Sequence, residues 1–164
     1  MFDPWLLWLE STAFSIWMRE STSLFAFPGI LAAHTIGLAF IAGLNVALDL
    51  RLLGVASRIP TIAFERLLPL MWLGLWVNIL SGVALLIGYP TKALTNPVFY
   101  LKLSFIAAAL VILQHVRRRL AWELVPSRAM KRLAVASLAC WAGAVVAGRL
   151  LAYTYSRLTI IDTV

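Results

Sequence analysis

The chain has 164 residues and a formal charge of +7; 62% of its residues are hydrophobic and 13% are charged. Soluble domains average about 45–50% apolar and about 25% charged residues, and a chain of this length has too little interior to bury the excess away from water. The composition therefore excludes a soluble domain, a disordered chain and, because there is one cysteine, a disulfide scaffold, and it predicts a protein that lives in a lipid bilayer.

Residues 1–23 are expected to form a separate segment outside the membrane-spanning domain. Their large apolar side chains, Trp5, Trp8, Phe14 and Trp17, recur at roughly helical spacing with polar residues between them. The segment lacks the basic start and the small-residue cleavage site of a signal peptide. We predict an amphipathic helix that lies in the outer membrane interface, either as an anchor or as a docking site for a partner.

Four apolar stretches follow, and each provides the roughly 20 residues that a membrane-spanning helix needs. They occupy residues 24–50, 67–88, 97–116 and 133–153 of a transmembrane domain that covers residues 24–164. The third stretch opens with Asn96 and Pro97, which suit a helix cap and the first helical position. The predicted fold is all-α, an integral membrane four-helix transmembrane bundle preceded by the amino-terminal interfacial amphipathic helix.

Basic residues concentrate in the first and third loops between these stretches. The first loop is surrounded by Arg51, Arg58 and Arg66, and the third contains Arg117, Arg118, Arg119, Arg128, Lys131 and Arg132. The middle loop has only Lys92. The positive-inside rule therefore places loops one and three in the cytoplasm and both termini outside. Cations in short loops indicate membrane topology, so no nucleic-acid partner is expected.

Function in such a chain is expected to rest on polar groups that lipid would normally exclude. The candidates are His34, Asn45, Asp49, Asn78, Ser81, Lys102, Ser104, Gln114, His115, Ser137, Cys140 and Arg149. Counting from the cytoplasmic arginines at 1.5 Å per residue puts His34 and Arg149 roughly 25 Å, and Lys102 roughly 22 Å, from that face. No acidic residue reaches this layer of three cations, so an anionic partner is expected there.

A haem b group with two propionates would suit Lys102 and Arg149, and it would leave His34 free to ligate the iron. The alternative is that both cations extend outward to lipid phosphates while His34 bonds a backbone carbonyl. His115 is the second candidate metal ligand, but it lies about 20 Å or more below His34. A single iron between the two histidines therefore requires strong helix tilt. Otherwise His115 belongs to a cytoplasmic-side site near Asp49 and Gln114, or it is a plain interfacial histidine.

The segments His34-Thr35-Ile36-Gly37, Asp49-Leu50-Arg51-Leu52-Leu53-Gly54 and Asn96-Pro97-Val98-Phe99, with Lys102 and His115, resemble an uncharacterised family of small four-helix bacterial membrane proteins. More distantly, His34, and Lys102 followed 13 residues later by His115, are similar to HemJ-type protoporphyrinogen oxidases and CopD-like membrane domains. The oxidases bind haem, and a first-helix histidine and a third-helix lysine are important to them. The resemblance implies those roles for His34 and Lys102, and a bacterial inner membrane as the location.

The sequence thus predicts a haem-b-binding membrane protein that transfers electrons, with quinone or an outer-face redox protein as its exchange partner. One alternative is an oxidoreductase of the protoporphyrinogen oxidase type, which would use the same residues. The other is a non-redox accessory subunit of a larger membrane complex, in which His34 is a structural hydrogen-bond donor. Assembly into a homo-oligomer is compatible with each of these hypotheses.

Overall fold

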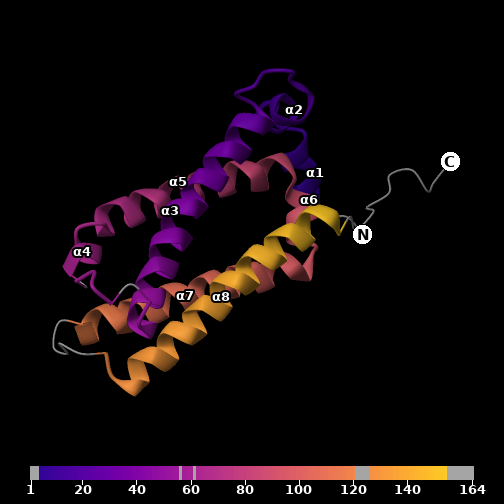
Figure 1. Ribbon diagram of the computed structural model, residues 1–164. Coiled ribbons are helices and arrows are strands. Elements are labelled where there is room, and N and C mark those ends of the chain that lie inside the picture. The colour runs from indigo at the N-terminus through magenta and orange to yellow at the C-terminus, as the bar shows by residue number, and fades with distance from the viewer. Residues whose placement is uncertain (1–3, 56, 61, 121–125, 155–164) are drawn as a thin grey trace.

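The computed structural model describes residues 4–55, 57–60, 62–120 and 126–154, and the regular elements in these ranges are all helices. Four of them are long and apolar enough to cross a membrane: α3 (Phe27–Leu53), α5 (Leu68–Gly88), α7 (Pro97–Leu120) and α8 (Arg128–Tyr153). They form an elongated bundle with the short helices at its two ends (Figure 1). The predicted all-α, four-span membrane fold is confirmed.

The helices α7 and α8 extend further at their basic ends than the apolar stretches suggested. Helix α7 continues through the three arginines at 117–119 to Leu120, and α8 begins at Arg128, whereas the sequence placed these boundaries at 116 and 133. Arginine is a good helix former, and cations at a helix carboxyl end interact favourably with its dipole. Ser127 caps α8 by accepting a hydrogen bond from the Met130 amide. Hydropathy therefore marks where the apolar stretches end, while these helices continue beyond them.

The amino-terminal segment is two short helices, α1 (Pro4–Glu10) and α2 (Ala13–Glu20), where one amphipathic helix was expected. The break occurs because the Thr12 side chain caps α2 by accepting from the Ser15 amide, a local hydrogen bond that competes with helix continuation. Met18 is buried with 1% of its surface exposed, and α2 packs on the carboxyl end of α5. We call this end of the bundle, opposite the arginines of α7, the outer end. The segment therefore docks on the bundle instead of lying apart from it.

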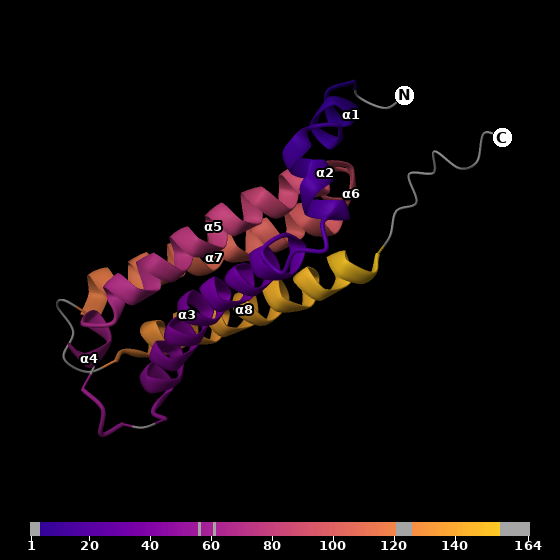
Figure 2. The same ribbon diagram turned by 90° about the horizontal axis from the view of Figure 1, so that it is seen from above.

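The long helices pack in pairs, α3 on α5 and α7 on α8, and α3 also packs on α8 (Figures 1 and 2). Glycine permits the closest approach. A Cβ atom added to Gly37 of α3 would lie 2.7 Å from the Asn78 amide nitrogen and 2.8 Å from the Gly74 carbonyl oxygen on α5. Small residues at such crossings let helix backbones touch inside a membrane, and here they bring α3 and α5 into direct contact.

The buried apolar side chains form two clusters at different depths along the bundle. The cluster toward the basic end comprises Leu48, Leu52, Met71, Leu113, Val116, Met130 and Ala134. The outer cluster comprises Ile41, Ala109, Trp141 and Ala144. Many other large apolar side chains of the long helices are exposed, as expected for surfaces that face lipid, which is as apolar as they are.

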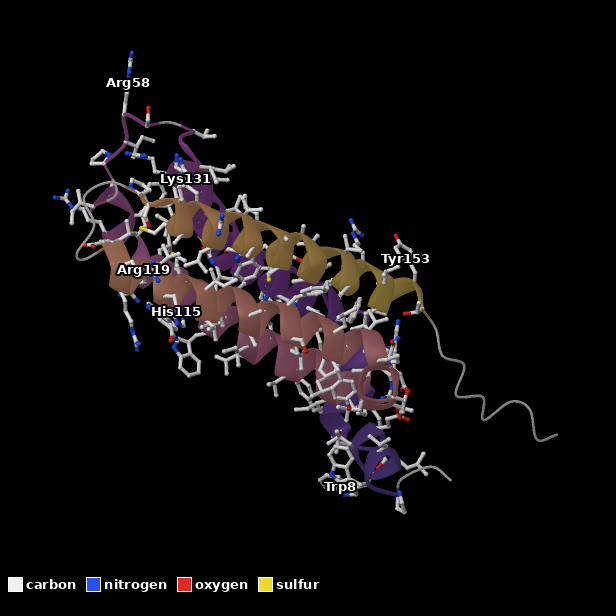
Figure 3. The ribbon with its side chains drawn as sticks, turned by 90° about the horizontal axis from the view of Figure 1, so that it is seen from below. Trp8, Arg58, His115, Arg119, Lys131 and Tyr153 are labelled. Atoms are coloured by element: carbon white, nitrogen blue, oxygen red, sulfur yellow. The ribbon has the colours of Figure 1, made fainter. Side chains whose placement is uncertain are left out.

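Two further short helices, α4 (Ile62–Glu65) and α6 (Pro90–Leu94), lie at opposite ends of the bundle. Figure 3 shows Arg58, Arg119 and Lys131 at the α4 end, while Trp8 and Tyr153 lie at the other. The loops that the sequence identified as strongly basic therefore share one end of the molecule.

Candidate functional site

His34 of α3 lies among three of the four long helices. Its Nδ1 atom is 3.1 Å from the Asn78 carbonyl oxygen and 3.1 Å from Ser81 Oγ, both on α5. Its Nε2 atom is 3.4 Å from Lys102 Nζ on α7. The ring is thus held at both nitrogens, and the two residues that the sequence singled out most strongly, His34 and Lys102, are in direct contact.

These neighbours define which ring nitrogen carries the proton. A lysine ammonium group has only donors, so the Nε2 atom that faces Lys102 accepts. The proton is then on Nδ1, which donates to the Asn78 carbonyl oxygen. Ser81 Oγ donates to the Val77 carbonyl oxygen at 2.6 Å, which leaves Nδ1 as the donor on that side of the ring. Metal-ligating histidines commonly donate through Nδ1 to a carbonyl and coordinate through Nε2; here the Nε2 lone pair accepts from Lys102.

The surroundings keep the ring in this position. Asn78 Nδ2 donates to the His34 carbonyl oxygen at 2.8 Å, which ties α3 and α5 together in the opposite direction. A Cβ atom at Gly82 would lie 3.2 Å from His34 Cε1, so a glycine there leaves room for the ring. Gly148 of α8 lies beside Lys102: a Cβ atom added there would be in ordinary contact with the Lys102 Cε atom, at 3.8 Å. We refer to His34, Asn78, Ser81 and Lys102 as the outer polar cluster.

The outer polar cluster carries positive charge without a matching carboxylate. Lys102 is partly buried in an apolar helix, and among the described residues no acidic side chain is paired with its ammonium group. A cation in a low-dielectric region needs a counter-charge or a strong acceptor. The neutral imidazole supplies one acceptor, so the cluster still favours an anionic ligand.

Arg149 and His115 lie outside the outer polar cluster. The Arg149 side chain is exposed on α8, although the sequence placed it at the depth of Lys102. Depth was estimated correctly, but the direction around the helix was not available from a residue count. His115 is also exposed, its Nδ1 atom bonds the Val111 carbonyl oxygen of its own helix at 2.9 Å, and Figure 3 shows it at the basic-end half of α7. Thirteen residues along α7 separate it from Lys102, roughly 20 Å.

The second site that the sequence suggested, His115 with Asp49 and Gln114, is not assembled either. Asp49 is buried on α3 with 1% of its surface exposed, and the polar side chain that approaches it is Ser137 of α8. Gln114 instead lines a cavity of about 650 Å³ at the basic end, together with Arg117, Arg118 and apolar side chains of α3, α4 and α5. The cavity lining does not include His34 or Lys102.

The outer polar cluster fits part of what a haem requires. His34 Nε2 would be the ligand atom, and Lys102, whose Nζ is 3.4 Å from Nε2 in this structure, would have to move away from it to coordinate the iron or to meet a propionate. His115 does not fit as the other axial ligand of the same iron, and Arg149 is directed away from the cluster. The donor set therefore supports one histidine ligand with Lys102 beside it.

The alternative that His34 bonds a backbone carbonyl is confirmed, and the carbonyl is that of Asn78. Sequence reasoning identified Asn78 and Ser81 as polar residues in a span but did not place them beside the ring. A signal was present, because Gly74, Asn78, Ser81 and Gly82 recur at helical spacing on one face of α5. A face of small and polar residues in a membrane helix indicates contact with a neighbouring helix.

Comparison of the chain with protein-family models, with curated proteins and with solved structures gives no match. The chain is a four-span membrane protein by its fold. The family resemblance stays a prediction.

Proposed function

We propose that the chain binds b-type haem through His34 and transfers electrons within the membrane, exchanging them with a quinone or with a redox protein. The observation that carries the proposal is the His34 ring itself. Its Nδ1–H group donates to the Asn78 backbone carbonyl, and its Nε2 atom faces the amine nitrogen of Lys102. His34 and Lys102 both lie within the apolar part of the bundle.

In this proposal each residue of the outer polar cluster has a stated part. Asn78 and Ser81 orient the ring and fix its tautomer, a contribution that second-shell groups commonly make to metal sites. Lys102 would either coordinate the iron or neutralise a propionate. The haem would supply the redox chemistry, while the bundle adjusts its potential through ligation, burial and the nearby cation.

The test is an absorbance spectrum of the purified full chain, expressed with adequate haem and recorded oxidised and then dithionite-reduced. We expect a Soret band and sharp α and β bands on reduction. His34→Ala should lose these bands, whereas the matched control His115→Ala should retain them, because His115 is exposed and far from the cluster. A featureless spectrum of folded protein, unchanged by added haemin, would overturn the proposal.

A second variant separates the two parts considered for Lys102. Lys102→Gln should alter the band positions if the amine is an axial ligand, because the ligand set of the iron changes. If Lys102 pairs with a propionate, the bands should stay in place while haem is lost more readily. Retention of spectrum and affinity alike would remove Lys102 from the haem site.

A non-redox accessory subunit is the second candidate, and the amino-terminal helices favour it. Trp5 and Trp8 of α1 have 54% and 63% of their surfaces exposed, and large exposed aromatic patches are typical of contact surfaces. In that case the outer polar cluster only ties α3 to α5 and α7. A His34→Ala variant that folds, assembles and supports the activity of its complex would favour this function over haem binding.

We also propose that the basic end faces the cytoplasm of a bacterial inner membrane, with both termini outside, following the positive-inside rule. Exposed loop residues permit a direct test after Cys140 is replaced by alanine. A membrane-impermeant maleimide should label Thr95→Cys in intact cells, but should label Ser57→Cys only after lysis. Labelling of Ser57→Cys in intact cells would reverse the orientation.

A further inference from the structure

A second group of polar side chains is buried between α3 and α8, apart from the outer polar cluster. Asn45 and Asp49 lie on α3, and Ser137 and Trp141 lie on α8. Their exposed fractions are 0%, 1%, 0% and 2%. We call these four residues the inner polar cluster. In membrane spans, buried polar residues are costly and usually serve a function.

The geometry of the two helices brings these four residues to one place. Asn45 and Asp49 are four residues apart on α3, and Ser137 and Trp141 are four apart on α8, so each pair shares a helix face. The helices run in opposite directions through the bundle and pack on each other. Ser137 approaches Asp49, and the antiparallel register then places Trp141 at the level of Asn45.

The inner polar cluster does not satisfy its own polar atoms. Asn45 Nδ2, Asn45 Oδ1, Asp49 Oδ2, Ser137 Oγ and Trp141 Nε1 are buried without a hydrogen-bond partner. Most buried polar atoms in folded proteins are paired, so five orphan atoms in four neighbouring residues require an explanation. Both acceptors and donors are present, which is what a ligand with its own bound water would use.

The surroundings exclude bulk water and supply no counter-charge. On the outer side lie Ile41 and Ala144, and on the side toward the basic end lie Leu52 and Ala134, all members of the two apolar clusters. Among the described residues no basic side chain interacts with the Asp49 carboxyl group. The cluster therefore has one acidic group, several neutral donors and acceptors, and no partner for the charge.

We propose that the inner polar cluster binds a single Na⁺ ion. The ligands would be the Asp49 carboxylate, Asn45 Oδ1 and Ser137 Oγ, with a water molecule that Trp141 Nε1 can hydrogen-bond. These are hard oxygen donors, which exclude soft metals. One carboxylate matches one monovalent charge, whereas Ca²⁺ sites collect six to eight oxygens, commonly from several carboxylates. The inference is independent of the haem proposal, because the two clusters share no residue.

The test uses the full chain, purified in detergent and sodium-free choline chloride buffer. NaCl is titrated in at constant ionic strength while thermal unfolding is followed by tryptophan fluorescence, and equilibrium dialysis with ²²Na⁺ measures the number of ions bound. We expect Tm to rise with Na⁺ and to saturate, one ion to bind per chain, and KCl to have a smaller effect. An identical Tm in choline, K⁺ and Na⁺, with no bound ²²Na⁺, would overturn the proposal and assign neutralisation of Asp49 to a proton.

Variants locate the effect. Asp49→Asn keeps the size of the side chain but removes the charge, so it should abolish both the Na⁺-dependent rise in Tm and the bound ²²Na⁺. Ser137→Ala removes one ligand and should move half-saturation to higher Na⁺ concentration while leaving the carboxylate, which keeps the test open if Asp49→Asn does not fold. Glu65→Gln, at an exposed position of α4, is the matched control and should respond like the original protein. Loss of the response in Glu65→Gln, or its retention in Ser137→Ala at unchanged half-saturation, would contradict the assignment.

Discussion

Replacing Gly37 with alanine should separate α3 from α5, whereas the same change at Gly43 of the same helix should not. The added Cβ at Gly37 would lie 2.7 Å from the Asn78 amide nitrogen and 2.8 Å from the Gly74 carbonyl oxygen, both backbone atoms that cannot rotate away. At Gly43 no atom lies within 4 Å of the added Cβ. The two variants therefore differ in contact while sharing the same helix and the same chemical change.

The structure gives the size of the displacement. Ordinary contact begins at 3.4 Å, so the two helices must move apart by about 0.7 Å at Gly37. A shift of that size would stretch the His34 Nδ1 to Asn78 oxygen distance from 3.1 Å to roughly 3.8 Å, beyond hydrogen-bonding range. Gly37→Ala strains the folded state by about 1–3 kcal/mol and weakens polar contacts worth about 0.6 kcal/mol each. These losses outweigh the roughly 0.5–1 kcal/mol by which alanine stabilises a helix relative to glycine.

We therefore expect Gly37→Ala to lower the free energy of unfolding by about 1–3 kcal/mol, and Gly43→Ala to raise it by roughly 0.5–1 kcal/mol. Reversible unfolding in mixed micelles with increasing SDS, followed by circular dichroism, measures both values. If the proposed haem site is correct, Gly37→Ala should also hold haem less tightly, while Gly43→Ala should not. Equal stability of the two variants would refute the reasoning that backbone contact at Gly37 limits the approach of α3 and α5.

Two further predictions concern the outer end of the bundle. Met18→Ala removes a side chain that is 1% exposed and should weaken docking of α2 by about 2–5 kcal/mol. In limited proteolysis the amino-terminal segment should then be cut faster. Trp17→Ala is the control, because 40% of the Trp17 surface is exposed. Arg149→Gln should change the free energy of unfolding by no more than about 0.5 kcal/mol, because the side chain is exposed; a larger loss would place Arg149 in a buried contact.

The membrane spans were predictable because lipid imposes one dominant requirement. Every backbone polar group in the hydrocarbon must be bonded within its own helix, so a sufficiently long apolar stretch has a single solution. Helix ends obey other rules that hydropathy does not report. The arginines of α7 continue the helix in water, and Thr12 divides the amino-terminal segment through a hydrogen bond to Ser15.

For the candidate site, the sequence predicted the level of the residues along the bundle but not the side of the helix on which each side chain lies. Counting residues placed His34, Lys102 and Arg149 in one layer, and the first two indeed touch. Whether a side chain points inward depends on which helix faces pack together. Residue spacing describes each helix alone and does not show which face meets a neighbouring helix. The placement of Asp49 and Ser137 near each other shows the same limit, because it depends on the antiparallel packing of α3 and α8, which no local pattern contains.

The two polar clusters lie too far apart to neutralise each other's charge, so the two proposed sites can be tested separately. His34, which contacts Lys102, and Asp49 are 15 residues apart on α3, roughly 22 Å along the helix axis. At an effective dielectric constant of about 20, opposite unit charges at that distance attract by only about 0.8 kcal/mol, against about 4 kcal/mol at 4 Å. A charge on either group is therefore neutralised locally: at Lys102 by the proposed haem, and at Asp49 by the proposed Na⁺ ion or by a proton. His34→Ala should abolish haem binding but spare the Na⁺ response, Asp49→Asn should do the reverse, and loss of both in either variant would show that α3 couples the two sites.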